Sequence, residues 1–299
     1  SLLPCSGVVT VGTGGQYGVF TTANGIFNAI NQAPALNGNL LIKVVSDITT
    51  EDGFVGLNQW NENGLGGYSI TIESDANVLR SISGSSGTNA GLFRMSGADR
   101  VTFNGGAGSN KFLKFSNMGT LAGAATYNII NDSKYITVNN CIIECGASSS
   151  TNGVVTIGTS SATGNDTITI TKCDIKSYAA NLPTYGVYGV GTTGRDNSGV
   201  IINNCNIYDV YSATIAPSAV YIGAGNSGWS IVSNKIYQTA ARSNTGSLLY
   251  TGIRINNSTG GGFVIDGNYI GGADASGSGV SSYGSGSAQY AGIHFWAAS

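Results

Sequence analysis

The stretch Ser198-Gly-Val-Ile-Ile-Asn-Asn-Cys-Asn-Ile207 decides the fold, because the same pattern recurs along most of the chain. Apolar residues alternate with polar ones, a polar two-residue corner follows, and a Cys or Asn then opens a second apolar run. Clear copies put this Cys or Asn at Cys141, Cys173, Cys205, Asn234 and Asn268, and looser copies anchor at Asp47, Asp75 and Gly106. A pattern repeated about every 30 residues is typical of a solenoid, in which each repeat forms one coil.

Each later repeat carries another short apolar run before this pattern, after a Gly, Ala or other small residue. These runs are Val154–Ile157, Val187–Val190, Val220–Ile222, Ile253–Ile255 and Ile293–Phe295. A third, more variable segment follows, so each coil has three short strands separated by Gly, Ser and Asn corners. The sequence therefore predicts an all-β fold, a single-stranded right-handed parallel β-helix of about eight coils, whose hand follows from the chirality of parallel crossovers.

Alternation within a strand predicts which side chains form the core. Ile136 and Val138 are expected to point inward and Thr137 outward, since successive side chains of a strand alternate between its faces. After the corner, the Cys or Asn points inward again, which predicts a core ladder of Cys141, Cys173, Cys205, Asn234 and Asn268. An apolar interior disfavours the thiolate, so we expect the three cysteines to be inert packing residues and the two asparagines to bond to each other.

The chain divides into three predicted parts. Residues 1–20 form an N-terminal arm with one short strand, residues 21–39 form a capping helix and loop, and residues 40–299 form the parallel β-helix. The helix prediction rests on Ile26, Phe27 and Ile30, which fall on one face and would cover the open end of the strand stack.

The N-terminal run from Val8 through Val9 to Val11 nearly repeats Val154–Ile157, although it precedes the helix. In one interpretation, this strand adds to the last coil of another subunit, where Ile293 and Phe295 lie on an unpaired edge. That interpretation predicts end-to-end self-association into a filament, and Cys5 would be placed to lock the joint. In the other interpretation, residues 8–11 form the first rung of their own solenoid. The chain begins at Ser1 without a signal peptide, so we expect it to be part of a longer protein.

The composition of the chain limits which kinds of binding partner are expected. Charged residues make up 9% of the chain and the net charge is −2, without a run of Lys or Arg. A nucleic-acid partner is therefore not expected. No apolar segment approaches the ~18 residues that span a bilayer, so membrane insertion is not expected either.

Cysteine and histidine usage argues against a metal centre or another cofactor. The five cysteines show no Cys-x-x-Cys spacing, and the single histidine is His294. Cys5 and Cys145 lie outside the core ladder, and their pairing is open. Calcium bound by oxygen ligands also stays open, because Glu51 and Asp52 have Asp47 and Glu62 nearby.

The residues needed for polysaccharide cleavage are missing as recognisable patterns. Glycoside hydrolysis needs paired carboxylates, and lyases need several calcium-binding carboxylates with a basic residue, whereas the aspartates here are scattered. Two tyrosine ladders are the better candidate site: Tyr188 with Tyr221, and Tyr208 with Tyr237. Tyrosine rings on a sheet face can stack on sugars, although ordinary packing between coils gives the same pattern. No catalytic residue is assigned.

A resemblance to a known family indicates where the protein is located. The repeat resembles the right-handed parallel β-helix superfamily over about residues 40–296. The opening motifs Gly14-Gly-Gln-Tyr17, Phe20-Thr-Thr-Ala23 and Leu41-Ile-Lys-Val-Val45 resemble those of pectinesterase-like β-helices. Together with Leu57-Asn-Gln-Trp60 and Gly91-Leu-Phe-Arg-Met95, they more closely resemble β-helix modules of secreted surface proteins of Bacteroidetes-type bacteria. The resemblance implies a scaffold that is extracellular or at the cell surface.

These observations predict a non-catalytic extracellular module with a structural or adhesive role, which self-associates or binds polysaccharide or other glycans. The alternatives are a carbohydrate-active enzyme (a polysaccharide lyase, hydrolase or esterase) and a carbohydrate-binding module. Thr167 in Asp166-Thr167-Ile168 resembles the O-glycan acceptor of Bacteroidetes-type secreted proteins, which predicts glycosylation at that residue.

Overall fold

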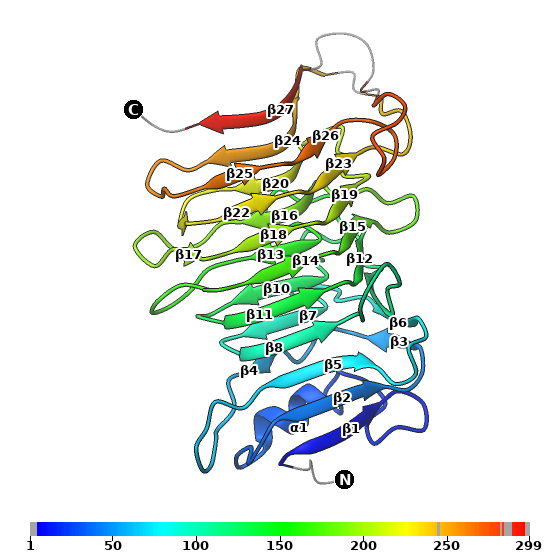
Figure 1. Cartoon of the computed structure of the whole chain (residues 1–299), viewed down its shortest axis with the longest axis vertical. Helices are drawn as coiled ribbons and strands as arrows, with labels where there is room; N and C mark the ends of the chain where they lie inside the picture. The colour runs from blue at the N-terminus through cyan, green and yellow to red at the C-terminus, as the bar shows by residue number, and fades with distance from the viewer. Residues whose placement is uncertain (1–4, 244–245, 282, 284–288, 297–299) are drawn as a thin grey trace.

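The computed structural model describes residues 5–243, 246–281, 283 and 289–296. The chain is a parallel β-solenoid of about 8 turns, consistent with a right-handed β-helix (Figure 1). One short helix, α1 (Ile26–Gln32), lies near the N-terminal end. The predicted fold class is therefore confirmed.

The strands stack into three long sheets, which we call sheets 1, 2 and 3. Sheet 1 contains β1 (Gly7–Val11), β2 (Leu40–Val44), β5 (Ile70–Ser74), β8 (Asp99–Asn104), β11 (Lys134–Asn139), β14 (Thr169–Thr171), β18 (Ile201–Asn203), β22 (Ser230–Val232) and β25 (Val264–Asp266).

The other two long sheets have eight strands each. Sheet 2 contains β4 (Leu57–Asn58), β7 (Phe93–Ser96), β10 (Tyr127–Ile130), β13 (Val155–Ile157), β16 (Tyr185–Gly189), β20 (Ser218–Ile222), β24 (Leu249–Asn256) and β27 (Gln289–Trp296). Sheet 3 contains β3 (Ile48–Glu51), β6 (Arg80–Gly84), β9 (Leu113–Asn117), β12 (Ile142–Cys145), β15 (Asp174–Ser177), β19 (Asn206–Tyr208), β23 (Lys235–Tyr237) and β26 (Tyr269–Ile270). A short fourth sheet pairs β17 (Asn197–Ser198) with β21 (Asn226–Ser227).

The core follows the predicted alternation. Ile136 and Val138 are fully buried, and they pair in register with Val101 and Phe103 of the preceding coil. Near the N-terminal end the interior is aromatic, and ring centroids of neighbouring residues lie 4.9–6.1 Å apart, mostly edge to face. Such contacts contribute about 0.5–1.5 kcal/mol each beyond the burial of area. The rings belong to Phe20, Phe27, Phe93, Phe103, Phe115 and Tyr127.

The N-terminal strand belongs to the solenoid. β1 pairs in parallel with β2 along its whole length, and Val9 and Val11 are fully buried while Val8 is exposed. The second interpretation of residues 8–11 therefore describes this structure, and the solenoid begins at Gly7, before the helix. The chain leaves β1, forms α1 and returns to β2, so the helix lies within the first coil.

The helix closes the first edge of sheet 2. β4 is the last strand at that end, and its open edge is met by the side chain of Asn31 from α1. Asn31 donates to the Gly56 carbonyl at 2.8 Å and accepts the Asn58 N–H at 2.9 Å. One amide side chain thus replaces the missing neighbouring strand, which protects an edge that would otherwise pair with another chain.

The first anchor of the repeat is displaced by two residues from the predicted one. The sequence pattern aligned Ile42 and Val44 with Ile70 and Ile72, whereas the structure pairs Leu40 with Ile70 and Ile42 with Ile72. Asp47 is consequently not equivalent to Asp75. Alternation has a period of two, so a shift of two residues keeps every side chain on its predicted face and leaves the pattern unchanged.

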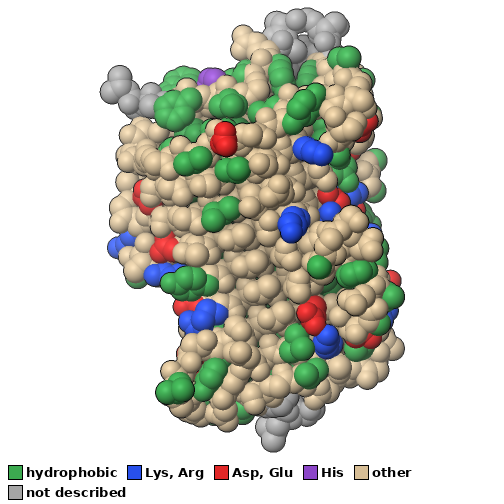
Figure 2. Space-filling view, viewed as in Figure 1, with side chains coloured by type: hydrophobic (Ala, Val, Ile, Leu, Met, Phe, Trp, Pro, Cys, Tyr) green, Lys and Arg blue, Asp and Glu red, His purple; other side chains and the backbone are tan. Residues whose placement is uncertain are grey.

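The outer face of sheet 1 is polar and largely uncharged. Thr71, Thr102, Thr137 and Thr169 occupy one ladder on consecutive strands. In Figure 2 this face is mainly tan, the colour of the backbone and of side chains that are neither apolar nor charged, and Lys, Arg, Asp and Glu are few and dispersed. The face therefore carries no continuous patch of a single charge.

Candidate functional site

The outer face of sheet 2 carries the most distinctive row of side chains. In register, from the N-terminal to the C-terminal coils, it reads Arg94, Asn128, Thr156, Tyr188, Tyr221, Arg254 and His294. We call this row the sheet-2 ladder. Its residues lie one strand apart, so each packs on the next along the solenoid axis.

The centre of the sheet-2 ladder is an aromatic stack. The rings of Tyr188 and Tyr221 are stacked, with centroids 5.1 Å apart and planes 7° apart. Tyr185, which is mostly buried, supports both rings at 5.0 and 5.3 Å. The guanidinium of Arg254 lies 5.7 Å from the ring centroid of Tyr221, and Asn256 donates to the Tyr221 hydroxyl at 3.0 Å. Tyr221 is thus held between a ring and a cation.

The stack ends at Tyr188, where the ladder steps down to a smaller residue. The next residue toward the N-terminal coils is Thr156, whose side chain is too short to cover the Tyr188 ring. This step opens a groove of about 280 Å³. The groove is lined by Asn128, Ile130, Thr151, Asn152, Thr156, Gly158, Thr159, Tyr188 and Val190.

Asn128 gives the groove an unsatisfied acceptor. Its side chain is only 5% exposed, and its Nδ2 donates to the Ala90 carbonyl at 2.7 Å. Its Oδ1 has no hydrogen-bond partner among the described residues. A buried polar atom without a partner costs about 1–3 kcal/mol, so Asn128 favours a donor that enters the groove.

The groove is uncharged at neutral pH. Its lining contains hydroxyls, amides and apolar side chains but no ionised group among the described residues. Burial raises the pKa of Tyr188 to about 12, so its phenol stays protonated. The groove therefore suits a neutral ligand with hydroxyl groups.

The second tyrosine pair lies on sheet 3. The rings of Tyr208 and Tyr237 are stacked at 4.8 Å, and Lys176 lies 5.9 Å from the Tyr208 centroid. Lys176 also forms an ion pair with Glu144 at 2.8 Å. Tyr237 is only 8% exposed, and burial raises its pKa to about 12. This pair is covered at both rings, which is the ordinary packing arrangement rather than an open platform.

The far end of the sheet-2 ladder carries Arg254 and His294 at neighbouring positions. The Arg254 Nε and His294 Nδ1 atoms are buried, and neither has a hydrogen-bond partner within the described part of the chain. No carboxylate occupies the ladder, so the arrangement lacks the second group of an acid–base pair.

The predicted core cysteines lie together inside the solenoid. Cys141, Cys173 and Cys205 are buried and free, and the Cys141 N–H points to the Cys173 sulfur at 3.5 Å. Burial raises the pKa of the Cys141 and Cys205 thiols, which keeps them protonated. Cys145 is buried too, and Cys5 is partly exposed.

The amides continue this ladder toward the C-terminal coils. The Cys205 N–H donates to Asn234 Oδ1 at 2.9 Å. Asn234 Nδ2 in turn donates to Asn268 Oδ1 at 2.9 Å and to the Ile202 carbonyl at 2.8 Å. Buried amides are therefore satisfied from one coil to the next, as their shared sequence position suggested.

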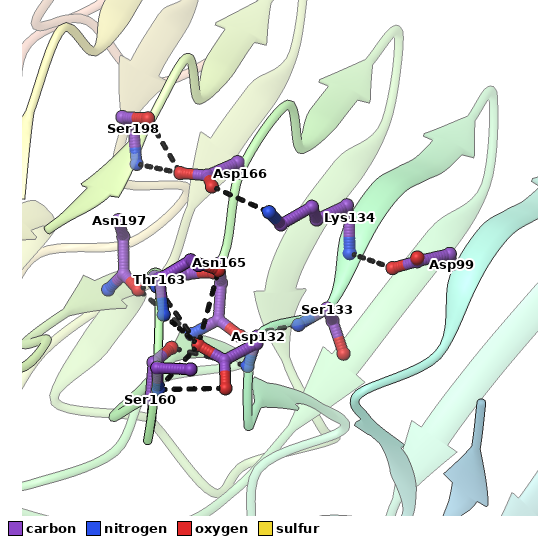
Figure 3. Close-up of polar contacts among 12 residues, drawn as sticks. Asp99, Asp132, Ser133, Lys134, Ser160, Thr163, Asn165, Asp166, Asn197 and Ser198 are labelled. Carbon is purple, nitrogen blue, oxygen red and sulfur yellow. Dashed lines mark hydrogen bonds and ion pairs between the residues drawn. The ribbon is translucent and has the colours of Figure 1, made fainter. Parts of the chain in front are cut away.

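A second amide ladder was missed by the sequence analysis (Figure 3). At another corner, Asn165 donates to Asn197 at 2.8 Å, and Asn197 donates to Asn226 at 3.0 Å. Asn257 donates to the Asn226 carbonyl at 2.7 Å. Its signal in the sequence is an Asn followed by Asp or Ser once per repeat.

The acidic residues beside this second ladder cap loops. Asp132 accepts backbone N–H groups from Thr163 at 2.6 Å and Gly164 at 3.0 Å, as Figure 3 shows in part. Asp166 accepts the Ser198 hydroxyl at 2.6 Å and lies 3.6 Å from Lys134 Nζ. These carboxylates hold corners in place and are not arranged as a pair about an open site.

The side chains of Thr167 and Asn165 differ in their accessibility to glycosylation. The Thr167 side chain is exposed in the segment just before β14, whereas Asn165, which opens an overlapping Asn-x-Thr motif, is fully buried. Of the two acceptors, only Thr167 presents its side chain to a modifying enzyme in the folded protein.

The acidic residues that left calcium open each have their own partners. Glu51 is buried and bonded to Thr21, and Glu62 forms an ion pair with Arg100 at 2.7 Å. Asp47 accepts the Ser81 N–H at 2.8 Å. Over the described residues, no three His, Cys, Asp or Glu side chains are grouped so that they could hold a metal ion.

The C-terminal strand exposes apolar side chains. Ile293, Phe295 and Trp296 of β27 are 53%, 61% and 60% exposed. β27 and β25 are the last described strands of sheets 2 and 1, so their outer backbone edges have no neighbouring strand in this part of the chain.

Comparison with protein-family models, curated proteins and solved structures gave no match for this chain. The class of protein is therefore defined by its fold, a parallel β-solenoid. No helix in the described ranges combines the length and the apolar character needed to cross a membrane.

Proposed function

We propose that the chain is a non-catalytic adhesive solenoid, extracellular or at the cell surface, that binds glycans on its side. The observation that carries this proposal is the Tyr188–Tyr221 stack, which borders a groove lined by amides and hydroxyls. Aromatic rings beside hydrogen-bonding groups suit sugars, which have apolar faces and polar edges. A place in secreted surface proteins of Bacteroidetes-type bacteria, which the sequence resembles, fits this role.

The non-catalytic part of the proposal is supported by how the carboxylates are used. Asp132 caps a loop, Glu144 pairs with Lys176, and Arg242 binds Asp209. A glycosidase holds its two carboxyl groups about 5–10 Å apart across an open cleft, and the groove beside Tyr188 is lined by none.

A binding assay with a turnover control tests this function. The purified chain is incubated with a panel of soluble and insoluble polysaccharides, and bound protein and newly formed reducing ends or unsaturated products are measured together. We expect retention on at least one neutral polysaccharide, without product, and loss of retention in the Tyr188→Ala/Tyr221→Ala double variant. Product formation would instead favour the carbohydrate-active enzyme, and absence of any retention would overturn the adhesive role.

End-to-end assembly is a second candidate function, favoured by the exposed apolar residues of β27. Strands β1 and β25 are the end strands of sheet 1 over the described residues, although Thr10 at the outer edge of β1 already bonds to Gln16 and Tyr17. Addition of β1 from one subunit to β25 of the next would continue the sheet and cover Ile293 and Phe295. This joint uses β1 in its observed place, so the N-terminal strand need not leave its own solenoid.

Light scattering across a concentration series tests the joint. We expect mass to rise with concentration in the native chain and to stay at one subunit in an Ile293→Asp/Phe295→Asp variant. A native chain that remains monomeric up to millimolar concentration would exclude assembly.

A further inference from the structure

We infer that the groove beside Tyr188 seats one neutral pyranose ring, which continues the tyrosine stack and donates a hydroxyl to Asn128. This inference rests on the proposed glycan-binding function and names the site and the class of sugar. It follows from three observations: a ring face without a covering neighbour, an unpaired buried acceptor, and an uncharged lining.

The first observation is the asymmetry of the stack. Tyr221 has a ring on one side and the guanidinium of Arg254 on the other. Tyr188 has Tyr221 stacked on one face and Tyr185 beside it at a tilt, and the ladder continues beyond its other face with the smaller Thr156. The groove borders Tyr188 but not Tyr221, so the uncovered ring face of Tyr188 faces the groove. A flat ligand stacked there would occupy the place of a missing ladder residue.

The second observation fixes the polarity of the ligand. Asn128 lines the groove and uses its Nδ2 as a donor to the Ala90 carbonyl, so its Oδ1 is the side-chain atom left to accept a hydrogen bond. An oxygen acceptor recruits a hydroxyl donor and repels a carboxylate. Because Asn128 is 5% exposed, its hydrogen bond with a sugar would be shielded from water and would select strongly for a donor.

The third observation concerns size and charge. A volume of about 280 Å³ lies just below the range of about 300–1,000 Å³ typical of small-molecule sites, which favours one sugar ring over a longer buried chain. The absence of Lys, Arg and His from the lining leaves nothing to neutralise an acidic sugar. Ile130 and Val190 offer apolar contacts beside the tyrosine ring. The groove thus favours neutral hexoses over uronic acids.

The ladder geometry supplies a direct test, because the missing neighbour can be added. Thr156→Tyr should place a third ring on Tyr188 and fill the groove, while it extends a stack that the fold already tolerates. Asn128→Leu removes the acceptor with little change in volume. Tyr208→Ala on sheet 3 is the matched control, because it removes a stacked tyrosine outside the groove.

Binding is measured by NMR titration with methyl glycosides of glucose, galactose, mannose and fucose, and with glucuronic and galacturonic acids. We expect at least one neutral glycoside to bind in the millimolar range and to show contacts with the Tyr188 ring protons in the native protein. Affinity should fall at least tenfold in Thr156→Tyr and in Asn128→Leu, and it should stay within twofold in Tyr208→Ala. Uronic acids should bind at least tenfold more weakly.

The outcomes separate this inference from the function on which it rests. Binding that survives Thr156→Tyr but is lost in Tyr208→Ala would keep the glycan-binding function and overturn the groove as its site. Preferential binding of uronic acids would overturn the assignment to neutral sugars. Absence of binding to every saccharide and polysaccharide would overturn the function itself. If Thr156→Tyr does not fold, the contacts between the glycoside and Tyr188 in the native protein decide the site.

Discussion

The carboxylate of Glu51 accepts the backbone N–H groups of Phe20 and Thr21, each at 2.7 Å, although Glu51 is only 2% exposed. The Thr21 hydroxyl donates to the same carboxylate at 2.5 Å. Glu51 ends β3, the first strand of sheet 3, and Phe20 and Thr21 precede α1. One buried acid therefore fastens the segment before the helix to the first edge of a sheet.

Replacement of Glu51 by Gln should lower the free energy of unfolding by about 1–3 kcal/mol, because an amide has one acceptor where three donors converge. Denaturant unfolding of the two proteins at pH 7 measures this loss. Glu73→Gln is the control, since that glutamate pairs with Lys43 near the surface and its loss should change stability by less than about 1 kcal/mol. Equal effects of the two substitutions would contradict the role of the buried carboxylate.

The same carboxylate predicts a pH dependence. Burial raises the pKa of Glu51 above its ordinary value of 4.5, against the lowering effect of its hydrogen bonds. The folded state then binds the proton more readily than the unfolded chain, so this contribution to stability is present below pH 4.5 and is lost as pH rises through the folded pKa. The stability of the native protein relative to Glu51→Gln should therefore increase as pH falls from 7 toward 4.5. A difference that shrinks over this range would show that the pKa is lowered instead.

The second amide ladder predicts a localised stability loss. Asn197 accepts from Asn165 and donates to Asn226, so Asn197→Ala leaves buried groups unpaired on two neighbouring coils. We expect a loss of at least about 1–3 kcal/mol in the free energy of unfolding. Asn24→Ala, at an exposed position, should change it by less than about 0.5 kcal/mol. An Asn197→Ala protein as stable as the control would mean that the ladder contributes nothing.

Thiol reactivity tests the placement of the cysteines. In the native protein only Cys5 should react rapidly with a thiol reagent, because the other four cysteines are buried. Burial also raises the pKa of Cys145 to about 11, which suppresses its thiolate. All five should react after unfolding, and Cys173→Ser should cost about 1–3 kcal/mol by placing a hydroxyl in the apolar core. Rapid reaction of more than one thiol in the folded state would contradict this arrangement.

The capped loop at Asp132 should open when its carboxylate is changed. Burial acts to raise the pKa of Asp132, but the backbone hydrogen bonds from Thr163 and Gly164 hold this pKa well below 3.8. The stabilisation is therefore present above pH 3.8 and is lost as pH falls through the lowered pKa. Asp132→Asn should speed hydrogen exchange at residues 162–164 about fivefold at pH 7, as expected for the loss of about 1 kcal/mol. Asp266→Asn, which changes an exposed aspartate elsewhere, should leave exchange in this loop unaltered.

Glycosylation remains a prediction from the resemblance, sharpened by exposure. If the source organism attaches O-glycans at such motifs, the protein purified from that organism should be heavier than its polypeptide, and Thr167→Ala should remove the added mass. Asn165 should carry no glycan, because its side chain is fully buried. An intact mass equal to that of the unmodified chain would contradict the predicted glycosylation.

The repeat pattern predicted the fold because burial imposes alternation on every coil. Ile136, Val138 and their equivalents could be placed on the correct face without knowledge of their partners. The strand register of the first coil was harder to predict, because a shift of two residues around Ile42 keeps the same alternation of buried and exposed side chains. The position of β1 within the solenoid was one of two interpretations, since the intervening helix interrupts the repeat.

The candidate site was predictable only in part. The register that brings Tyr188 and Tyr221 together follows from the repeat, but the groove depends on which neighbour is small. Thr156 is an ordinary strand residue in the sequence, and only its place beside the last ring of the stack makes it the floor of an opening. The unpaired oxygen of Asn128 is likewise invisible without the position of Ala90, which belongs to the previous coil.

The junction at which Cys205 gives way to Asn234 in the core ladder has a consequence for how a solenoid of this kind can gain coils. A thiol and an amide occupy one position on successive coils, and the Cys205 N–H finds its acceptor in the amide above it. A tandem copy of residues 173–204 would insert one whole coil between two cysteines and leave that junction untouched. Such a duplication would lengthen the solenoid while its cross-section stays nearly the same. Selection can therefore change the length of the solenoid independently of the surfaces that it displays.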